Sequence, residues 1–528
     1  MSFANLLEAV LTGVGSDSGR IEHFLDHWAR AAPHDVAAIE GEARISFRGL
    51  GEATDRIAGR LISAGIAPGD CVAVLAPPSI DFLASFLAVL KAGATWLGVN
   101  PKYTRAEIHH LLEDASPKLL MARKRIHERD YVDDIVAFAP SRPAEVSPFA
   151  VWWLEPEPAA AISPAMLGDT TEDIEPFPVA AVRSPSEIAA YVYTSGSTGQ
   201  PKAARLSHRA LIRGARVRAK AWPVSPLRLI NNLPINHVGC LGDVACTALI
   251  AGGSQVFLDR FSAAGTLRAI DQHGVTYWYQ APTMFEMCLA APEANDTNWS
   301  SLQAAIWSGG RPSDALLGRM AAISPMLAMD YSMTESVGPI TMTPLWDSAV
   351  AHDGSVGWPD PGRQLRIGDG CGDAQTGEVM INDEWMFSGY RRPEGAIDAF
   401  SSDGWFRTGD LAARDANGRW RLVGRSKEMF KSGGYNVYPR EIEMAIESHP
   451  AVSSAVVVEA PDPLYGEVGI AFVVAPNGRV TVEALRAYCR ERLANYKVPK
   501  QFEFMDALPM LAIGKVDKVA LRRRLQPR

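Results

Sequence analysis

The segment from Tyr191 to Lys202 carries the strongest chemical signal in this sequence. It reads YVYTSGSTGQPK, so two glycines, several hydroxyl side chains and a lysine follow one another closely. Glycines let backbone N–H groups approach a ligand, while hydroxyls and an ammonium group add further donors. Such donors suit a polyphosphate, although the spacing is not that of a Walker A loop. The expected contacts are Thr194, Ser195, Gly196, Ser197, Thr198, Gly199 and Lys202.

The run TSGSTGQPK resembles the phosphate loop of the acyl-adenylate-forming enzymes, a superfamily of acyl-CoA synthetases, nonribosomal adenylation domains and luciferases. The resemblance covers nearly the whole chain, from LKAGATWLGVNP near residue 90 to a lysine near the C-terminus. It is most like a carboxylic acid–CoA ligase. The resemblance implies that the catalytic residues are Lys515, Glu335, Thr194 and Lys202.

The hexapeptide DYSMTE at residues 330–335 resembles the family's nucleotide motif. By this resemblance, Tyr331 packs on the adenine, Thr334 contacts the α-phosphate and Glu335 helps to hold Mg²⁺. A carboxylate is a suitable ligand for this hard cation, and phosphate oxygens complete its shell. The segment departs from the family pattern at Ser332, where a glycine is usual.

Other residues around this hexapeptide are implied to contact the nucleotide. Met329 stands where a polar residue is common, so Asp330 is expected to supply an adenine contact instead. The segment WFRTGDL resembles the family's TGD motif, in which Asp410 accepts hydrogen bonds from the ribose diol. Arg425 is implied to reach the ribose or a phosphate, and Gly310 to border the adenine.

Two further segments are implied to form the acid site. The segment WSGGRP resembles the family's SGGxP loop, and it places Trp307, Ser308 and Gly309 at the acyl tunnel. His237 falls where CoA ligases usually carry an aromatic residue or histidine near a glycine, so it would line the acyl pocket. A structural role for this histidine is an equal alternative.

No motif identifies the acid itself. Trp278, Tyr279 and Trp307 have large side chains close to these segments. If they face inward, they narrow the pocket, and we therefore predict a compact aromatic or branched acid rather than a long chain.

The segment from Gly424 to Glu443 resembles the family's hinge, with Lys427 at the pivot. The resemblance implies a domain of residues 1–426 that binds ATP and acid, and a mobile domain of residues 427–528. Lys431, Gly433 and Gly434 would border the pantetheine arm of CoA after this domain rotates. The PMLAIGK segment near the C-terminus is a weaker match, in which Lys515 faces the α-phosphate during adenylation.

Alternation of strand and helix patterns predicts an α/β fold with a parallel sheet and covering helices. Residues 188–193 predict a buried strand before the phosphate loop, and residues 139–187 predict a surface excursion without regular structure. From about 355 the short strands predict a β subdomain, and from about 428 a small α+β unit. The expected elements are strands at 45–47, 71–75, 96–99, 255–258, 276–279, 378–381, 420–423, 454–459 and 469–474, and helices at 50–64, 81–92, 105–115, 439–448 and 482–493.

Length and composition restrict the class of protein. A chain of 528 residues is too long for one hydrophobic core, and 47% hydrophobic residues exclude a mostly disordered chain. The net charge of −8 argues against nucleic-acid binding. Six cysteines without a CxxC pair favour a reducing, cytoplasmic compartment. The apolar stretch at 82–90 is too short to span a membrane, and the N-terminus does not read as a secretory signal.

We therefore predict a ligase that forms acyl-AMP from an acid and ATP with Mg²⁺, and then transfers the acyl group to CoA. Its partners would be small molecules, and a homodimer is compatible with the sequence. The alternatives are an acyl-AMP ligase that loads a carrier protein, a non-catalytic adenylate-binding homologue and an ordinary ATPase or kinase. The sequence lacks the aspartate of amino-acid-activating relatives in the segment at His237, and no carrier domain follows residue 528.

Overall fold

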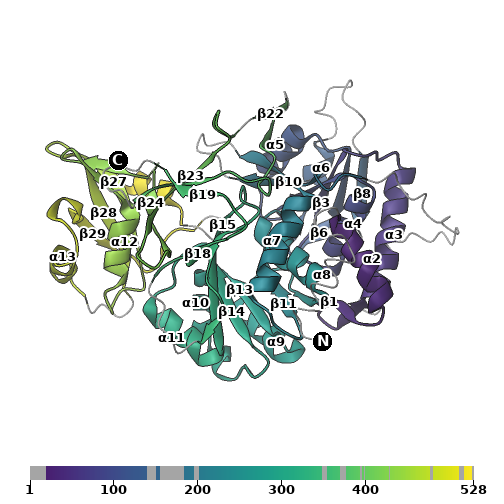
Figure 1. Ribbon diagram of the computed structural model, residues 1–528, viewed down its shortest axis with the longest axis horizontal. Coiled ribbons are helices and arrows are strands. Elements are labelled where there is room, and N and C mark those ends of the chain that lie inside the picture. The colour runs from purple at the N-terminus through teal and green to yellow at the C-terminus, as the bar shows by residue number, and fades with distance from the viewer. Residues whose placement is uncertain are drawn as a thin grey trace.

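The computed structural model describes residues 19–138, 150–154, 183–194, 201–347, 354–368, 376–392, 395–397, 399–426, 428–475, 480–510 and 516–525. Figure 1 shows a large N-terminal part of layered helices and sheets and a smaller C-terminal part at the far end of the molecule. The predicted α/β class is confirmed.

The phosphate-loop strands belong to an eight-stranded sheet whose middle strands pair in parallel. Its order is β22 (Gly395–Ile397), β21 (Tyr390–Arg392), β10 (Lys202–Ser207), β9 (Ile188–Thr194), β4 (Thr95–Val99), β3 (Cys71–Leu75), β5 (Leu119–Arg123) and β8 (Ala150–Leu154). Strands β3 and β4 are buried along their whole length, as their continuous apolar runs predict. Helices α3 (Phe47–Ser63), α4 (Ile80–Lys91) and α5 (Arg105–Ala115) connect or cover this sheet.

A second sheet of ten strands carries most of the site residues. Its order is β18 (Trp358–Pro359), β16 (Gly338–Met342), β15 (Met326–Met333), β14 (Ala304–Ser308), β13 (Tyr277–Gln280), β11 (Arg228–Asn231), β12 (Ser254–Phe257), β1 (Val36–Glu40) and β2 (Ala43–Ser46), with β17 (Trp346–Asp347) beside β15. Strands β11, β13, β14 and β15 pair in parallel. The carboxyl ends of these parallel strands therefore meet at one edge of the sheet.

One hydrophobic core joins the two sheets. Buried residues of both sheets and of the helices that connect their strands form a continuous cluster. The connecting helices are α2 (Ile21–Ala31), α7 (His208–Ala221), the π-helix η3 (Gly239–Cys246), α8 (Thr247–Ala251), α9 (Ala263–His273), α10 (Pro282–Ala290), η4 (Pro292–Asn295) and α11 (Asp314–Ile323). The layer containing α7, η3 and α8 holds the buried charges described below.

Most predicted elements have the expected positions, with shifts of a few residues. The strand at 71–75 and the helix at 105–115 are confirmed at their predicted bounds. Helix α3 begins at Phe47, earlier than predicted, because the Ser46 side chain accepts the Gly49 N–H and caps the helix there. The predicted surface excursion at 139–187 is wrong at Ala150–Leu154, which forms β8 and extends the sheet beside β5.

The C-terminal half contains two antiparallel systems. The predicted β subdomain is a sheet of β19 (Leu365–Ile367), β20 (Thr376–Ile381), β23 (Phe406–Arg414) and β24 (Trp420–Arg425). The last unit has β25 (Phe430–Ser432), β26 (Tyr435–Val437), β27 (Ser454–Asp462), β28 (Gly466–Val474), β29 (Gln501–Phe504), α12 (Pro439–Glu447), α13 (Val482–Arg490), η5 (Asn495–Lys497) and α14 (Lys518–Leu525). Short pieces β6 (Arg125–Ile126), β7 (Arg129–Asp130) and α6 (Val132–Val136) lie near α5 in the chain.

The last unit has hydrophobic clusters of its own on both faces of its sheet. Strand β24 ends at Arg425, just before this unit begins with β25. A separate core is what a rotating domain needs, because it can then move without opening the main core. The boundary at 426/427 and the rotation stay predictions, and Lys427 lies outside the described residues.

Candidate active site

The two ends of the predicted phosphate loop lie on paired strands. Strands β9 and β10 pair antiparallel, and Thr194 lies directly opposite Lys202. The strand predicted before the loop is confirmed. Residues Ser195, Gly196, Ser197, Thr198 and Gly199 lie outside the described residues, so the structure places only the two ends of the loop.

Lys202 and Glu335 both lie next to Tyr390, a residue that no sequence motif had indicated. The Lys202 ammonium is 5.6 Å from the centre of the Tyr390 ring, and the Tyr390 hydroxyl donates to Oε1 of Glu335 at 2.6 Å. Glu335 is 7% exposed, and its main-chain oxygen accepts the N–H of Phe387. Burial and the Glu335 carboxylate both raise the pKa of Tyr390, which therefore stays a neutral donor.

The structure brings Tyr331, Asp410 and Arg425 together from three strands. The Tyr331 hydroxyl donates to Oδ2 of Asp410 at 2.7 Å, and Nε of Arg425 donates to Oδ1 at 2.8 Å. Asp410 and Arg425 are register partners in β23 and β24. Asp410 is buried, whereas the Arg425 side chain is 56% exposed, so the arginine can reach a ligand while it holds the carboxylate. Asp410 raises the pKa of Arg425.

The prediction that the Asp330 side chain contacts adenine is wrong. The Asp330 carboxylate is 0% exposed, and Oδ2 accepts Nε and Nη2 of Arg218 at 3.1 and 2.8 Å. Strand alternation explains this, because Asp330 and Tyr331 are adjacent in β15 and must face opposite sides of the sheet. Tyr331 faces Asp410, and Asp330 faces the helical layer.

Two of the three aromatic residues expected to narrow the acid pocket are instead buried in the hydrophobic core. Trp278 is fully buried and packs on Phe285 and Trp299, with ring centres 4.3 and 6.0 Å away. Trp307, also expected at the acyl tunnel, is fully buried with its ring edge-on to Trp346. Neither tryptophan ring is therefore open to a ligand in this structure.

Ser308 and Tyr279 lie on the face of the sheet opposite the two tryptophans. The Ser308 hydroxyl donates to the main-chain oxygen of Asp330 at 3.1 Å and lies 3.4 Å from Oγ of Ser332. Gly309 has a φ of +87°, a conformation that glycine adopts without strain, and a Cβ there would meet no neighbour within 4 Å. A Cβ on Gly310 would be 4.0 Å from Pro282, so the predicted acid loop leaves its two glycines open.

The His237 ring and main chain both form hydrogen bonds within the turn that precedes η3. Its ring Nδ1 accepts the N–H of Gly239 at 3.0 Å, and its main-chain N–H donates to Pro234. The half-buried ring therefore caps the start of η3, which supports the structural alternative, while its role at the acyl pocket stays a prediction.

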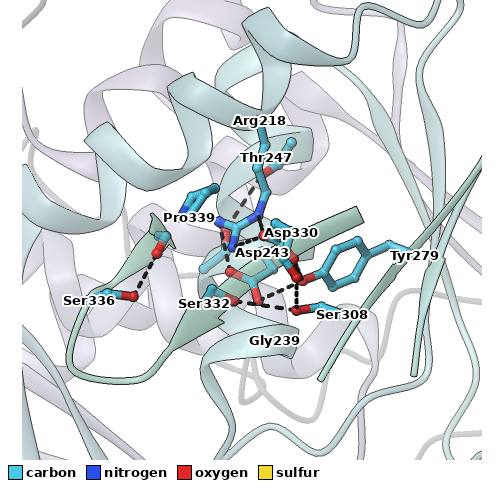
Figure 2. Close-up of polar contacts among 12 residues, drawn as sticks. Arg218, Gly239, Asp243, Thr247, Tyr279, Ser308, Asp330, Ser332, Ser336 and Pro339 are labelled. Atoms are coloured by element: carbon cyan, nitrogen blue, oxygen red, sulfur yellow. Dashed lines mark hydrogen bonds and ion pairs between the residues drawn. The ribbon is translucent and has the colours of Figure 1, made fainter. Parts of the chain in front are cut away.

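A buried network of charges lies under the Ser308 loop, and Figure 2 shows how its side chains converge. Arg218 of α7 forms ion pairs with Asp243 of η3 at 2.9 Å and with Asp330 at 2.8 Å. The Tyr279 hydroxyl lies 3.1 Å from Oδ1 of Asp330 and 3.3 Å from Oδ2 of Asp243. Arg218 and Asp243 were missed by motif comparison, although Asp243 is the one charged residue in the apolar stretch 238–251, which is a readable signal.

Burial raises the pKa of Asp243 to about 6, although Arg218 offsets part of this effect. Above that pH the folded chain must bury a charge that the unfolded chain keeps in water. Since an unfolded aspartate loses its proton near pH 4, this cost accumulates as the pH rises from about 4 to 6.

We therefore expect Asp243→Asn to gain stability relative to the wild type as the pH rises. The free energy of unfolding of the variant minus that of the wild type should increase by about 1–2 kcal/mol between pH 5 and pH 7.5. Denaturant unfolding at the two pH values measures this difference. The exposed Asp296→Asn is the control and should show almost none. If Asp243→Asn instead destabilises the protein, and does so more at pH 7.5 than at pH 5, the ion pair between Arg218 and the ionised Asp243 stabilises the fold.

The residues expected at CoA lie on the β25–β26 hairpin of the last unit. Gly433 and Gly434 form its turn with φ of +57° and +86°, and Gly433 N–H donates to the main-chain oxygen of Tyr465 at 2.8 Å. A Cβ on Gly434 would meet nothing within 4 Å, and Lys431 is exposed. The hairpin tip is therefore open, as a surface that receives a second substrate must be. Lys515 lies outside the described residues.

Comparison with known proteins decides the family. Residues 25–391 match the model of the AMP-binding enzyme family, and residues 441–515 match that of the AMP-binding enzyme C-terminal domain. The chain belongs to the AMP-binding enzyme family. Its relatives include several CoA ligases, so the predicted class of AMP-forming acid–CoA ligase is confirmed.

Relatives of this AMP-binding enzyme align over nearly its whole length. Feruloyl-CoA synthase of Amycolatopsis sp is 32% identical over 94% of this chain and 97% of its own. Indoleacetate–CoA ligase of Aromatoleum aromaticum is 32% identical over 95% of this chain and 98% of its own. MatB from Rhodopseudomonas palustris is 29% identical in sequence. Its ATP-bound crystal structure superposes with a TM-score of 0.83 and covers 96% of this chain and 99% of the MatB chain.

Within the described residues, no helix is long and apolar enough to cross a bilayer. No cluster of three or more histidine, cysteine, aspartate or glutamate side chains there is arranged to hold a metal ion.

Proposed function

We propose that this protein activates an aromatic carboxylic acid with ATP and transfers it to CoA in a site bounded by Lys202, Glu335, Tyr331 and Asp410. The observation that carries this proposal is the convergence of motif residues from separate segments in two contact groups. Lys202, Tyr390 and Glu335 form one group, and Tyr331, Asp410 and Arg425 form the other. Tyr331 and Glu335 lie four residues apart, so the two groups adjoin.

The two groups suit opposite ends of ATP. Tyr331 offers an aromatic ring, and Asp410 with Arg425 offers an acceptor and a donor for the ribose. Lys202 brings positive charge to the phosphates from the phosphate-loop hairpin, and Thr334 lies one residue before Glu335. When bound beside Glu335, Mg²⁺ would neutralise phosphate charge, and one Glu335 oxygen remains beyond the one that accepts from Tyr390.

In the first step, an oxygen of the acid attacks the α-phosphorus, and the bond from that phosphorus to pyrophosphate breaks. The charge that develops on the phosphoryl oxygens is met by Lys515 and Lys202, whose ammonium groups need no proton transfer. The products are acyl-AMP and pyrophosphate. This step uses no covalent intermediate with the enzyme.

In the second step, the CoA sulfur attacks the acyl carbon, the bond from that carbon to the AMP oxygen breaks, and the thiol proton is lost to solvent. The open β25–β26 tip supports a role for Gly433 and Gly434 against the pantetheine, with Lys431 beside it. A rotation about Lys427 would move Lys515 away from the acyl carbon and bring the β25–β26 tip to it. Alternatives that load a carrier protein, or that have lost activity, are not favoured by relatives that are named CoA ligases.

The names of the relatives support an aromatic acid, since they include a feruloyl-CoA synthase and an indoleacetate–CoA ligase. A panel of acids scored for AMP release tests this. We expect arylacetic or cinnamic acids to exceed straight-chain acids of eight and sixteen carbons by at least about tenfold in kcat/KM. Equal or better turnover of the straight chains would contradict the aromatic class.

We also propose a cytoplasmic location, because the five cysteines of the described residues are buried free thiols. Self-association stays a prediction.

A further inference from the structure

Strand β23 bulges at residues 408–410, the segment predicted to recognise the ribose. The residues on both sides of this segment are register partners of β20, but between them β23 has three residues where β20 has only Val379. The ladder of main-chain hydrogen bonds is therefore interrupted at the bulge. Gly409 lies at its centre with a φ of +77°, in the left-handed region that favours glycine. The polar main-chain groups of the bulge consequently need partners from outside the ladder.

The side chain of Glu378, on β20, supplies one of these partners. Its Oε1 accepts the Gly409 N–H at 2.9 Å, and its Oε2 pairs with the guanidinium of Arg407. The Glu378 side chain is 10% exposed, whereas that of Arg407 is 64% exposed, so the ion pair lies at the solvent and contributes little. The hydrogen bond from Gly409 is the sheltered contact, and it is strong because the acceptor is charged.

The other polar groups of the bulge are also paired. The Thr408 hydroxyl donates to the main-chain oxygen of Val379 at 2.8 Å and accepts the Asp410 N–H at 3.1 Å. The main-chain oxygen of Gly409 accepts the N–H of Ser426 at 2.8 Å. The bulge is therefore held from β20 on one side and from the residue that follows β24 on the other.

This bulge determines where the Asp410 carboxylate lies. The Tyr331 hydroxyl donates to Oδ2 of Asp410, and Nε of Arg425 donates to Oδ1. Each carboxylate oxygen has a second lone pair, so the two oxygens together still suit a vicinal diol. Those further hydrogen bonds require the carboxylate to keep its place between Tyr331 and Arg425. The residue before Asp410 is the glycine whose N–H is bound by Glu378.

We propose that Glu378 is a positioning residue for ribose recognition. By holding the Gly409 N–H it orients Asp410 toward the ribose hydroxyls of ATP, and it thereby sets the preference for ATP over deoxy analogues. Glu378 acts through Asp410 and needs no contact with the nucleotide. Without this acceptor the Gly409 N–H loses its partner and the bulge relaxes, so the diol meets a misplaced carboxylate. The inference rests on the proposed function, in which Asp410 accepts from the ribose.

The test compares ATP with 2′-deoxy-ATP and 3′-deoxy-ATP as substrates, with one acid and CoA at saturating concentrations and release of the nucleoside monophosphate as the signal. We expect the kcat/KM of the wild type for ATP to exceed that for at least one analogue by at least about tenfold. Asp410→Ala should bring this ratio close to one. Glu378→Ala and Glu378→Asp should each lower it by at least about fivefold, because alanine has no acceptor and the aspartate side chain is one methylene too short.

Two further variants separate the accepted hydrogen bond from charge and from the exposed ion pair. Glu378→Gln keeps an oxygen that can accept from Gly409, so it should hold the wild-type ratio within about twofold. Arg407→Gln removes the ion pair and leaves the acceptor, so it should hold the ratio as well. The ratio compares two nucleotides on one preparation, so partial unfolding cancels from it. A purely structural Glu378 would lower both rates together and leave their ratio unchanged.

The outcomes distinguish this inference from the proposed function. A wild-type ratio in Glu378→Ala and Glu378→Asp, together with its loss in Asp410→Ala, overturns the inference and leaves the proposed function intact. A loss in Glu378→Gln as large as that in Glu378→Ala also overturns it, because the accepted hydrogen bond would then not be the cause. If the wild type does not distinguish the nucleotides, or Asp410→Ala keeps the ratio, the assignment of Asp410 to the ribose fails together with the inference.

Discussion

Glu335→Gln should lower acid-dependent adenylation by about 100-fold or more while the protein remains folded. Glutamine keeps the shape of the side chain and can still accept from Tyr390, but it removes the charge that would bind Mg²⁺. The rate of acyl-AMP formation should therefore fall, and raising Mg²⁺ should restore part of it. Single-turnover formation of acyl-AMP across a Mg²⁺ series measures both effects.

Tyr390→Phe is the matched control for this prediction. It removes the hydrogen bond to Glu335 but leaves the carboxylate and the ring beside Lys202. We expect a loss of about tenfold or less, with a Mg²⁺ dependence close to that of the wild type. If Glu335→Gln retains near-normal activity at limiting Mg²⁺, Glu335 is not part of the metal site.

Lys515→Ala and Gly434→Leu should impair opposite half-reactions. Without Lys515 the acid and the α-phosphate lose a cation, so acyl-AMP formation should fall by about 100-fold or more while supplied acyl-AMP still reacts with CoA. Leucine at Gly434 would fill open space at the hairpin tip, so this variant should form acyl-AMP and release pyrophosphate but make thioester slowly. Two single-turnover assays on each purified variant separate the steps.

A side chain at Gly434 also strains the backbone, because φ is +86° there. Gly65→Leu controls for this, since Gly65 has a φ of +82° and its Cβ would likewise meet nothing within 4 Å. We expect Gly65→Leu to lose comparable stability and keep both half-reactions. Equal loss of both steps in Lys515→Ala, or unchanged thioester formation in Gly434→Leu, would contradict the assignment of these residues to separate steps.

Local patterns were sufficient to predict many of the strands and helices and the residues of the recognisable motifs. The apolar run at 71–75 and the capped helix at 105–115 depend on short segments, and the structure has them at those bounds. Tyr331, Asp410 and Arg425 belong to recognisable strings, and they meet because β15, β23 and β24 converge. Each of these signals is contained within a few residues of sequence.

Contacts between distant segments could not be predicted in the same way. Arg218 and Asp330 are 112 residues apart, and no motif contains Arg218 or Asp243. The direction of Trp278 and Trp307 follows from strand alternation only when the bounds of β13 and β14 are known. Tyr390 pairs with Glu335 across 55 residues through a strand that has no motif of its own.

Acid-dependent exchange of labelled pyrophosphate into ATP, measured without CoA, tests the central claim most directly. An enzyme that forms acyl-AMP reversibly must return labelled pyrophosphate to ATP when acid, ATP and Mg²⁺ are present. We expect exchange that requires the acid and not CoA and that is lost in Glu335→Gln, and we expect AMP rather than ADP to be released once CoA is added. Exchange that is independent of acid, or ADP as the product, would contradict adenylation by this site.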